Sequence, residues 1–188
     1  MSKIASTFLY FGYGSNLLAK RIRIRNPTAQ RKAIAKLDNY RFDFNRKSGR
    51  WGGCTATIVP DPGKYVWGAV WEINSSDMDD LDKQEGVHDN IYSALQVKVT
   101  TTDGNVLECR VYQLIEQPET YVPAPLLPIE RRPSRIYLEV ILQGALESKL
   151  PEDYFQFLKS FPHNGYEGPV TVAGLDITFS ITKPNENA

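Results

Sequence analysis

The order of the expected secondary-structure elements is the feature that most restricts the fold of this chain. The strand-like segments come before residue 116, and the two clearest helix patterns come after residue 134. Because strands and helices do not alternate regularly, this order favours an α+β fold over a doubly wound parallel sheet. With 188 residues the chain can bury a substantial core. We therefore expect a single domain over residues 1–188, with its core over about 7–168 and a weakly patterned tail over 169–188.

Aromatic and β-branched residues mark the expected strands. The strand segments are residues 7–13, 32–46, 54–60, 65–73, 91–101 and 106–115. Asp61-Pro62-Gly63 predicts a turn between the third and the fourth strand, and Asp103-Gly104 predicts a hairpin turn between the last two.

Capping residues and prolines mark the expected helices. A short helix follows Ser15 and Asn16 and ends at Asn26-Pro27, and a capping box at Ser76 and Asp79 begins a helix that stops at Gly86. Two longer helices are expected over residues 135–150 and 151–161, with Pro151 at the start of the second.

Charge and cysteine content exclude several classes of protein. The 22 basic and 22 acidic residues balance, which removes the long-range attraction on which nucleic-acid binders depend. We expect the two basic clusters to lie on solvated faces; they are Arg21, Arg23 and Arg25, and Arg131, Arg132 and Arg135. Cys54 and Cys109 have no metal-site spacing and are expected to be reduced, buried thiols.

The apolar segments point to a cytoplasmic protein. None is long enough to cross a bilayer, and the apolar stretch near the N-terminus is short and lacks a small-residue cleavage site. We expect neither a membrane nor a nucleic acid among the partners. The proline-dense segment 118–133 has two open interpretations, a lid over a site or a mobile surface excursion.

The stretch GYGSN, residues 12–16, joins the first strand to a helix and is the first candidate site. Leu17 stands where a dinucleotide-binding fingerprint needs its third glycine, and the Gly-Lys-Ser/Thr of a P-loop is absent. Free N–H groups at such a junction can hold a carboxylate or a developing oxyanion. A tight turn with a capped helix is the alternative.

Glu85, at the predicted C-terminal end of a helix, is the second candidate. The helix dipole disfavours a carboxylate there, and partial burial would raise its pKa towards the range of a proton shuttle. An exposed glutamate at a frayed end is the alternative, and His88 is a weaker acid–base candidate. No nucleophilic triad and no metal site is indicated. An enzyme of this kind would need a proton shuttle, an oxyanion holder and a nucleophile supplied by the substrate.

Three motifs in order resemble the γ-glutamylcyclotransferase family: "FLYFGYGSNL", "LDKQEGV" and "PSRIYLEVILQGA", together with "VWGAVWEI" and "QGALESKLP". The resemblance extends from about Phe8 to about Tyr166. It implies a small mixed β-barrel with flanking helices. It also implies a reaction in which the α-amine of a γ-glutamyl amino acid attacks its own γ-carbonyl, releasing 5-oxoproline and a free amino acid without a cofactor or a metal.

The resemblance also implies roles for particular residues. Glu85 matches the catalytic glutamate, which would act as general acid and base. The residues matching the substrate-binding positions are Tyr10, Phe11, Gly12, Tyr13, Gly14, Ser15, Asn16, Tyr92 and Tyr137. Asn16 favours the branch that acts on general γ-glutamyl amino acids, and a cytoplasmic homodimer of the γ-glutamyl cycle and glutathione metabolism is implied.

Three features depart from the family pattern. Gly12 stands where the family usually has alanine, the proline-dense segment is longer than usual, and the tail after Gly168 is β-like or irregular instead of helical and charged. The rival hypothesis is a catalytically idle protein that keeps the γ-glutamyl pocket or uses the fold as an interaction module.

Overall fold

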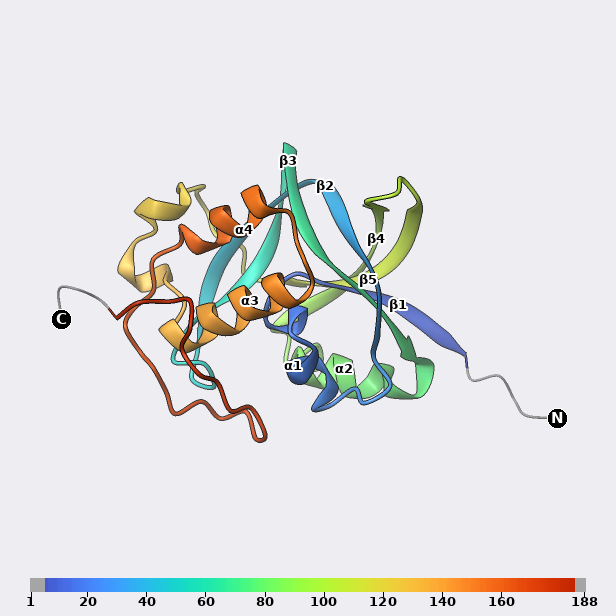
Figure 1. Cartoon of the computed structure of the whole chain (residues 1–188), viewed down its shortest axis with the longest axis horizontal. Coiled ribbons are helices and arrows are strands. Elements are labelled where there is room, and N and C mark those ends of the chain that lie inside the picture. The colour runs from blue at the N-terminus through green and yellow to red at the C-terminus, as the bar shows by residue number, and fades with distance from the viewer. Residues whose placement is uncertain (1–5, 185–188) are drawn as a thin grey trace.

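The computed structural model describes residues 6–184, and a closed barrel of five strands forms its centre (Figure 1). The strands are β1 (Thr7–Gly12), β2 (Gln30–Ser48), β3 (Gly53–Asn74), β4 (Tyr92–Thr101) and β5 (Val106–Leu114). Their order around the barrel is β1-β3-β2-β4-β5, and a parallel pairing of Tyr10 with Arg110 joins β1 to β5. The other pairs are antiparallel. The expected α+β fold with a mixed barrel is confirmed.

The predicted turn at residues 61–63 does not end a strand. β3 runs through it, and residues 61–64 form a bulge between the pairings of Pro60 and Tyr65 with β2. Gly63 has a φ of +83°, and its N–H donates to Asn39 Oδ1 at 3.2 Å. The turn residues supply a local bend, but pairing with the long partner strand resumes on both sides of it.

Helices flank the barrel. They are α1 (Ala19–Arg23), α2 (Met78–Gln84), α3 (Arg135–Glu147) and α4 (Glu152–Lys159), with short 3₁₀ turns η1 (Ser15–Leu17), η2 (Ser75–Asp77), η3 (Ala124–Leu126) and η4 (Ile129–Arg131). Two predicted helix boundaries are confirmed. α2 stops before Gly86, which has a φ of +67°, and α4 starts after Pro151, its N-cap. None of the helices within residues 6–184 has the length and apolar character needed to span a membrane.

Two predicted helix starts are wrong. The helix after the glycine loop is a 3₁₀ turn followed by five α-helical residues, and no side chain caps either part. α2 begins at Met78 with Asp77 as its N-cap, again without a side-chain cap, and the Ser76 hydroxyl donates to the Asp77 side chain. The Asn16 amide, expected as a cap, is used elsewhere.

α3 packs directly against the segment that follows β1. A Cβ atom on Gly144 would lie only 2.5 Å from the backbone nitrogen of Leu18, so the two backbones touch. The Ser148 hydroxyl donates to the carbonyl of Leu17 at 3.1 Å, and the N–H of Ala19 donates to Glu147 Oε1 at 3.0 Å. The helix therefore fixes the position of the loop that contains GYGSN.

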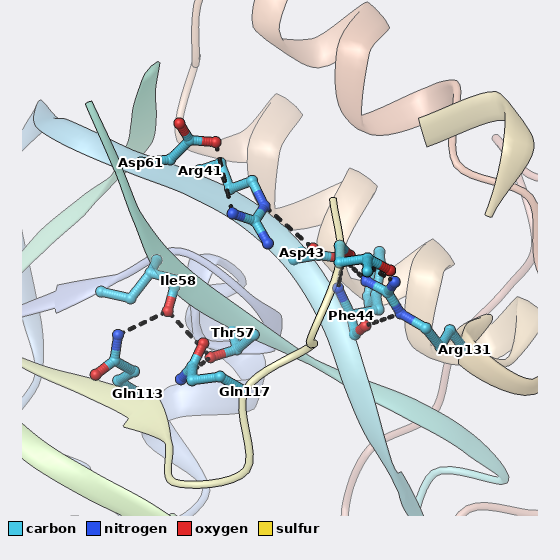
Figure 2. Close-up of polar contacts among 10 residues, drawn as sticks. Arg41, Asp43, Phe44, Thr57, Ile58, Asp61, Gln113, Gln117 and Arg131 are labelled. Carbon is cyan, nitrogen blue, oxygen red and sulfur yellow. Dashed lines mark hydrogen bonds and ion pairs between the residues drawn. The ribbon is translucent and has the colours of Figure 1, made fainter. Parts of the chain in front are cut away.

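The proline-dense segment 118–133 is folded onto the barrel. Ala124 and Leu127 are buried, and Figure 2 shows Arg131 bonded to the Asp43 carboxylate at 2.5 Å and to the carbonyl of Phe44 at 3.2 Å. The segment includes η3 and η4. It lines neither of the two cavities beside Glu85, so the structure does not place it as a lid there.

Of the two expectations for the tail, β-like or irregular, the structure shows the irregular one: residues 169–184 contain no helix or strand. This segment runs beside α3 (Figure 1). Buried Glu139 accepts the N–H groups of Ser180, Ile181 and Thr182. Arg135 is also buried, and its guanidinium donates to the carbonyl of Thr182 at 2.7 Å. A solvated face was therefore the wrong expectation for Arg135.

Both cysteines match their prediction. Cys54 and Cys109 are free thiols and both are buried. Burial raises the pKa of Cys109 to about 12, so this thiol is protonated near neutral pH.

Candidate active site

The GYGSN loop is the place where the chain leaves the barrel after β1. β1 stays paired with β3 as far as Gly12 and Ala69, and the chain then bends towards α3. A Cβ atom on Gly14 would lie 3.5 Å from the hydroxyl oxygen of Tyr137, and one on Gly12 would lie 3.2 Å from the carbonyl oxygen of Asn16. Small residues at both positions keep this backbone close to its neighbours.

The side chain of Asn16 connects the loop to the end of α2. Its Nδ2 donates to the hydroxyl of Tyr10 at 2.9 Å and to Glu85 Oε1 at 3.0 Å, and its Oδ1 accepts from Gln84 Nε2 at 3.1 Å. Gln84 Nε2 also donates to Glu85 Oε1, at 3.2 Å. Two neutral amides therefore orient one oxygen of the Glu85 carboxylate.

Glu85 is the C-cap residue of α2 and is only partly exposed. Burial raises the pKa of its carboxyl group above the usual value, while Arg21 and the hydrogen bonds from Gln84 and Asn16 oppose the rise. The net direction is upwards. A carboxyl group with a raised pKa is suited to accept and return a proton near neutral pH.

Two cavities meet at Glu85. The outer one has a volume of about 380 Å³ and the inner one about 30 Å³. Four predicted residues line both cavities: Ser15, Glu85, Tyr92 and Tyr137. Tyr10, Tyr13, Gly14 and Asn16 line only the inner cavity.

Phe11 and Gly12 line neither cavity, although they belong to the predicted binding stretch. Phe11 is fully buried in the core, and a Cβ atom on Gly68 would lie 2.6 Å from its Cζ. His88 is exposed and also lines neither cavity, so the structure does not bring it to Glu85.

The tyrosines around the inner cavity differ in what their hydroxyl groups do. The hydroxyl of Tyr92 donates to the carbonyl of Ala56 at 2.7 Å, and that of Tyr13 donates to the carbonyl of Tyr112 at 2.6 Å. The hydroxyl oxygen of Tyr137 instead accepts the N–H of Ala56 at 3.2 Å. Burial raises the pKa of Tyr137, which keeps its proton at neutral pH.

Arg21 is a site residue that the sequence did not reveal. Expected on a solvated face, it is instead 4% exposed, lines the outer cavity and donates to Gln84 Oε1 at 3.1 Å. Its guanidinium carbon lies 5.8 Å from the centre of the Trp51 ring, which in turn packs against Tyr137 at 4.7 Å. α1 is too short for its sequence pattern to define a buried face. Arg21 is buried in contact with Gln84 of α2 and with the Trp51 ring, both distant in the sequence.

Known proteins match this chain over most of its length. A model of the AIG2-like family matches residues 65–158. A mouse (Mus musculus) protein named gamma-glutamylcyclotransferase is 41% identical over 175 residues, which cover 91% of this chain and 87% of the relative. The human (Homo sapiens) protein of the same name is also 41% identical over 175 residues, with the same coverage.

A solved structure described as gamma-glutamyl cyclotransferase superposes with a TM-score of 0.79 at 38% identity, covering 88% of this chain and 94% of the other. The curated relatives are well above the identity and coverage needed to assign a family. The chain belongs to the γ-glutamylcyclotransferase family.

Proposed function

We propose that this protein converts γ-glutamyl amino acids into 5-oxoproline and a free amino acid. The observation that carries the proposal is the Glu85 carboxylate, partly buried where two cavities meet and oriented by the Asn16 and Gln84 amides. Relatives that are 41% identical carry the name gamma-glutamylcyclotransferase, which supports an enzyme over an idle binding module.

The reaction needs one group that moves protons. In the proposed mechanism Glu85 takes a proton from the α-ammonium group, and the free amine attacks the γ-carbonyl carbon. A C–N bond forms in the five-membered ring, and the amide C–N bond to the acceptor amino acid breaks. Glu85 then returns this proton to the leaving nitrogen, and the second proton, which the ring nitrogen loses as the lactam forms, passes through Glu85 to the amine of the released amino acid. The raised pKa of Glu85 suits both steps.

The oxyanion that forms at the γ-carbonyl needs donors. The N–H groups of Leu17 and Leu18 already donate to the carbonyls of Gly14 and Ser15, at 3.0 and 3.2 Å. We therefore assign the oxyanion to the N–H groups nearer the tip of the loop, those of Gly14 and Ser15, both of which line the inner cavity.

Tyr137 and Tyr92 receive different roles. Because the oxygen of Tyr137 accepts from Ala56 N–H, its proton can be donated to a substrate carboxylate. The Tyr92 hydroxyl already donates its hydrogen bond to the Ala56 carbonyl, so we assign Tyr92 to shaping the wall of the two cavities. Phe11 and Gly12 support the loop from the core side without touching the substrate.

The experiment is the release of 5-oxoproline from γ-glutamyl-alanine, measured by chromatography for the wild type and for Glu85→Gln. We expect release by the wild type and a loss of about a hundredfold or more in the variant, the usual scale for a general acid–base group. Equal release by both would remove Glu85 from the chemistry. Binding without release by the wild type would indicate the idle module.

Other properties follow from the family. We propose that the chain acts as a single domain in a cytoplasmic homodimer and takes part in the γ-glutamyl cycle and glutathione metabolism, without a metal or cofactor. Asn16 supports γ-glutamyl dipeptides as substrates, in preference to intact glutathione. Cleavage of glutathione together with failure on γ-glutamyl-alanine would contradict this preference.

A further inference from the structure

The outer cavity has an excess of positive charge that the proposed chemistry does not use. Five cationic side chains line it, and only two carboxylates do. The cations are Arg21, Arg46, Lys47, Arg50 and Lys83, and the carboxylates are Glu85 and Asp89. The whole chain has a formal net charge of zero, so this excess is local.

Three of these cations come from the end of one hairpin. Arg46 and Lys47 are near the end of β2, and Arg50 lies in the turn before β3. All three are exposed, and none of them makes an ion pair with any residue in the part of the chain that the structure describes. Their charges are therefore free to meet a ligand.

The backbone of the hairpin is distorted at this place. The β2–β3 register shifts between Asn45 and Lys47, and Arg46, the extra residue, has a φ of 48°. A bulge of this kind lets consecutive residues turn towards the same side, and both Arg46 and Lys47 line the cavity. A non-glycine residue in the left-handed region is a cost that often marks a functional position.

Arg21 adds a buried cation at the base of the same cavity. It is 4% exposed, its Nε is a buried donor with no acceptor among residues 6–184, and its direct contact is the neutral Gln84 oxygen rather than a carboxylate. A buried guanidinium with unused hydrogen-bonding capacity favours a carboxylate as its partner.

We propose that the outer cavity is the subsite for the acceptor amino acid and that its cations select acceptors carrying an additional carboxylate. This inference rests on the proposed function, which places the α-amine and the γ-carbonyl of the substrate at Glu85 and the loop. The inner cavity of about 30 Å³ is far too small for a second residue, so the acceptor extends into the outer cavity of about 380 Å³. γ-Glutamyl-glutamate and γ-glutamyl-aspartate are then preferred over γ-glutamyl-alanine.

The test compares kcat/KM for γ-glutamyl-glutamate and γ-glutamyl-alanine in two charge-matched triple variants. One carries Arg46→Gln, Lys47→Gln and Arg50→Gln. The control carries Lys98→Gln, Lys149→Gln and Lys159→Gln, which remove three exposed cations that do not line the outer cavity. The control variant therefore has the same change in net charge as the hairpin variant, but its hairpin is unchanged.

We expect the wild type and the control to prefer the acidic acceptor and the hairpin variant to lose the preference. Each exposed cation should contribute about two- to fivefold to it, the range for solvent-exposed ion pairs. The preference should also weaken as salt shortens the screening length from about 10 Å at 0.1 M to about 3 Å at 1 M. The same ratio of kcat/KM in the wild type and the hairpin variant would overturn the inference.

Binding separates this inference from the proposed function. Calorimetry on Glu85→Gln, with the same two dipeptides, gives a ratio of Kd values without turnover. Tighter binding of γ-glutamyl-glutamate that depends on the hairpin cations supports the acceptor subsite. If the wild type nevertheless releases no 5-oxoproline, only the proposed function is contradicted. Equal Kd values for the two dipeptides, or no binding of either, would overturn the subsite.

Discussion

Replacing Asn16 by aspartate tests the amide network with almost no change of shape. The Asn16 Nδ2 atom lies 3.0 Å from Glu85 Oε1 and 2.9 Å from the hydroxyl oxygen of Tyr10. In Asn16→Asp an oxygen takes its place and faces the Glu85 carboxylate. Two ionised carboxylates about 3 Å apart would repel by about 5.5 kcal/mol at an effective dielectric constant of 20, so the pair retains a proton instead.

The cost to folding follows from the hydrogen bonds that are lost. A hydrogen bond to a charged group contributes about 1.5–3 kcal/mol, and the free energy of unfolding should fall by about that amount near neutral pH. For a chain of this length each kcal/mol corresponds to roughly 2–4 °C in Tm. The shared proton places the folded pKa of the pair above the unfolded values.

The sign of the pH dependence follows from linkage. Groups whose folded pKa is raised contribute full stability below their unfolded pKa, about 4, and lose it as the pH rises through the folded pKa. The Tm deficit of Asn16→Asp relative to the wild type should therefore be small in acid and grow towards neutral pH. The acid limb of its kcat/KM profile should move to higher pH.

Scanning calorimetry and initial rates across this pH range provide the assay, with Asn16→Ala as the control. The alanine variant removes the same donors without adding a charge, so its Tm deficit should depend far less on pH. A Tm deficit of Asn16→Asp that stays constant from acid to neutral pH, with an unmoved acid limb, would refute the coupling between Asn16 and Glu85.

Three further substitutions test the surroundings of the site. Gly144→Ala places a Cβ atom 2.5 Å from Leu18 N, so it should destabilise the folded protein by about 1–3 kcal/mol and lower activity by displacing the GYGSN loop. A Tm within about 1 °C of the wild type would contradict this backbone contact. Asp82→Asn weakens the hydrogen bonds from Arg110 Nη2, at 2.8 Å, and from Tyr112, which connect α2 to β5. We expect the free energy of unfolding, measured with denaturant, to fall by about 1–3 kcal/mol, and an unchanged denaturation midpoint would contradict this role of Asp82. Tyr137→Phe keeps the packing on Trp51 but removes the hydroxyl, so kcat/KM for γ-glutamyl-alanine should fall by about tenfold or more with a Tm loss of only a few degrees. Full activity of this variant would show that the Tyr137 hydroxyl does not contact the substrate.

Local sequence signals predicted the parts of the site that depend on neighbouring residues. The end of α2 at Gly86 was predictable because a glycine with positive φ commonly follows a helix, and this placed Glu85 at the C-cap. The loop after β1 was predictable from the glycine, serine and asparagine residues that directly follow the apolar strand. Both signals lie within a few residues of the positions that they specify.

Contacts between distant segments account for what the sequence could not predict. Arg21 has the same residue type and spacing as Arg23 and Arg25, which are exposed, but it is buried in contact with the distant residues Gln84 and Trp51. Asn16 is a good N-cap type, yet Gln84, 68 positions along the chain, donates to its Oδ1 atom, the oxygen that a helix cap would use. Local propensity contains no information on either contact.

The chemistry of the site is tested most directly by reacting γ-glutamyl-alanine in water enriched in oxygen-18. Intramolecular attack by the α-amine consumes no water, so we expect 5-oxoproline and alanine in equal amounts, without oxygen-18 in the 5-oxoproline. Mass spectrometry distinguishes this product from that of hydrolysis. Glutamate carrying solvent oxygen as the first product would contradict cyclisation and show that water, not the substrate amine, attacks the γ-carbonyl.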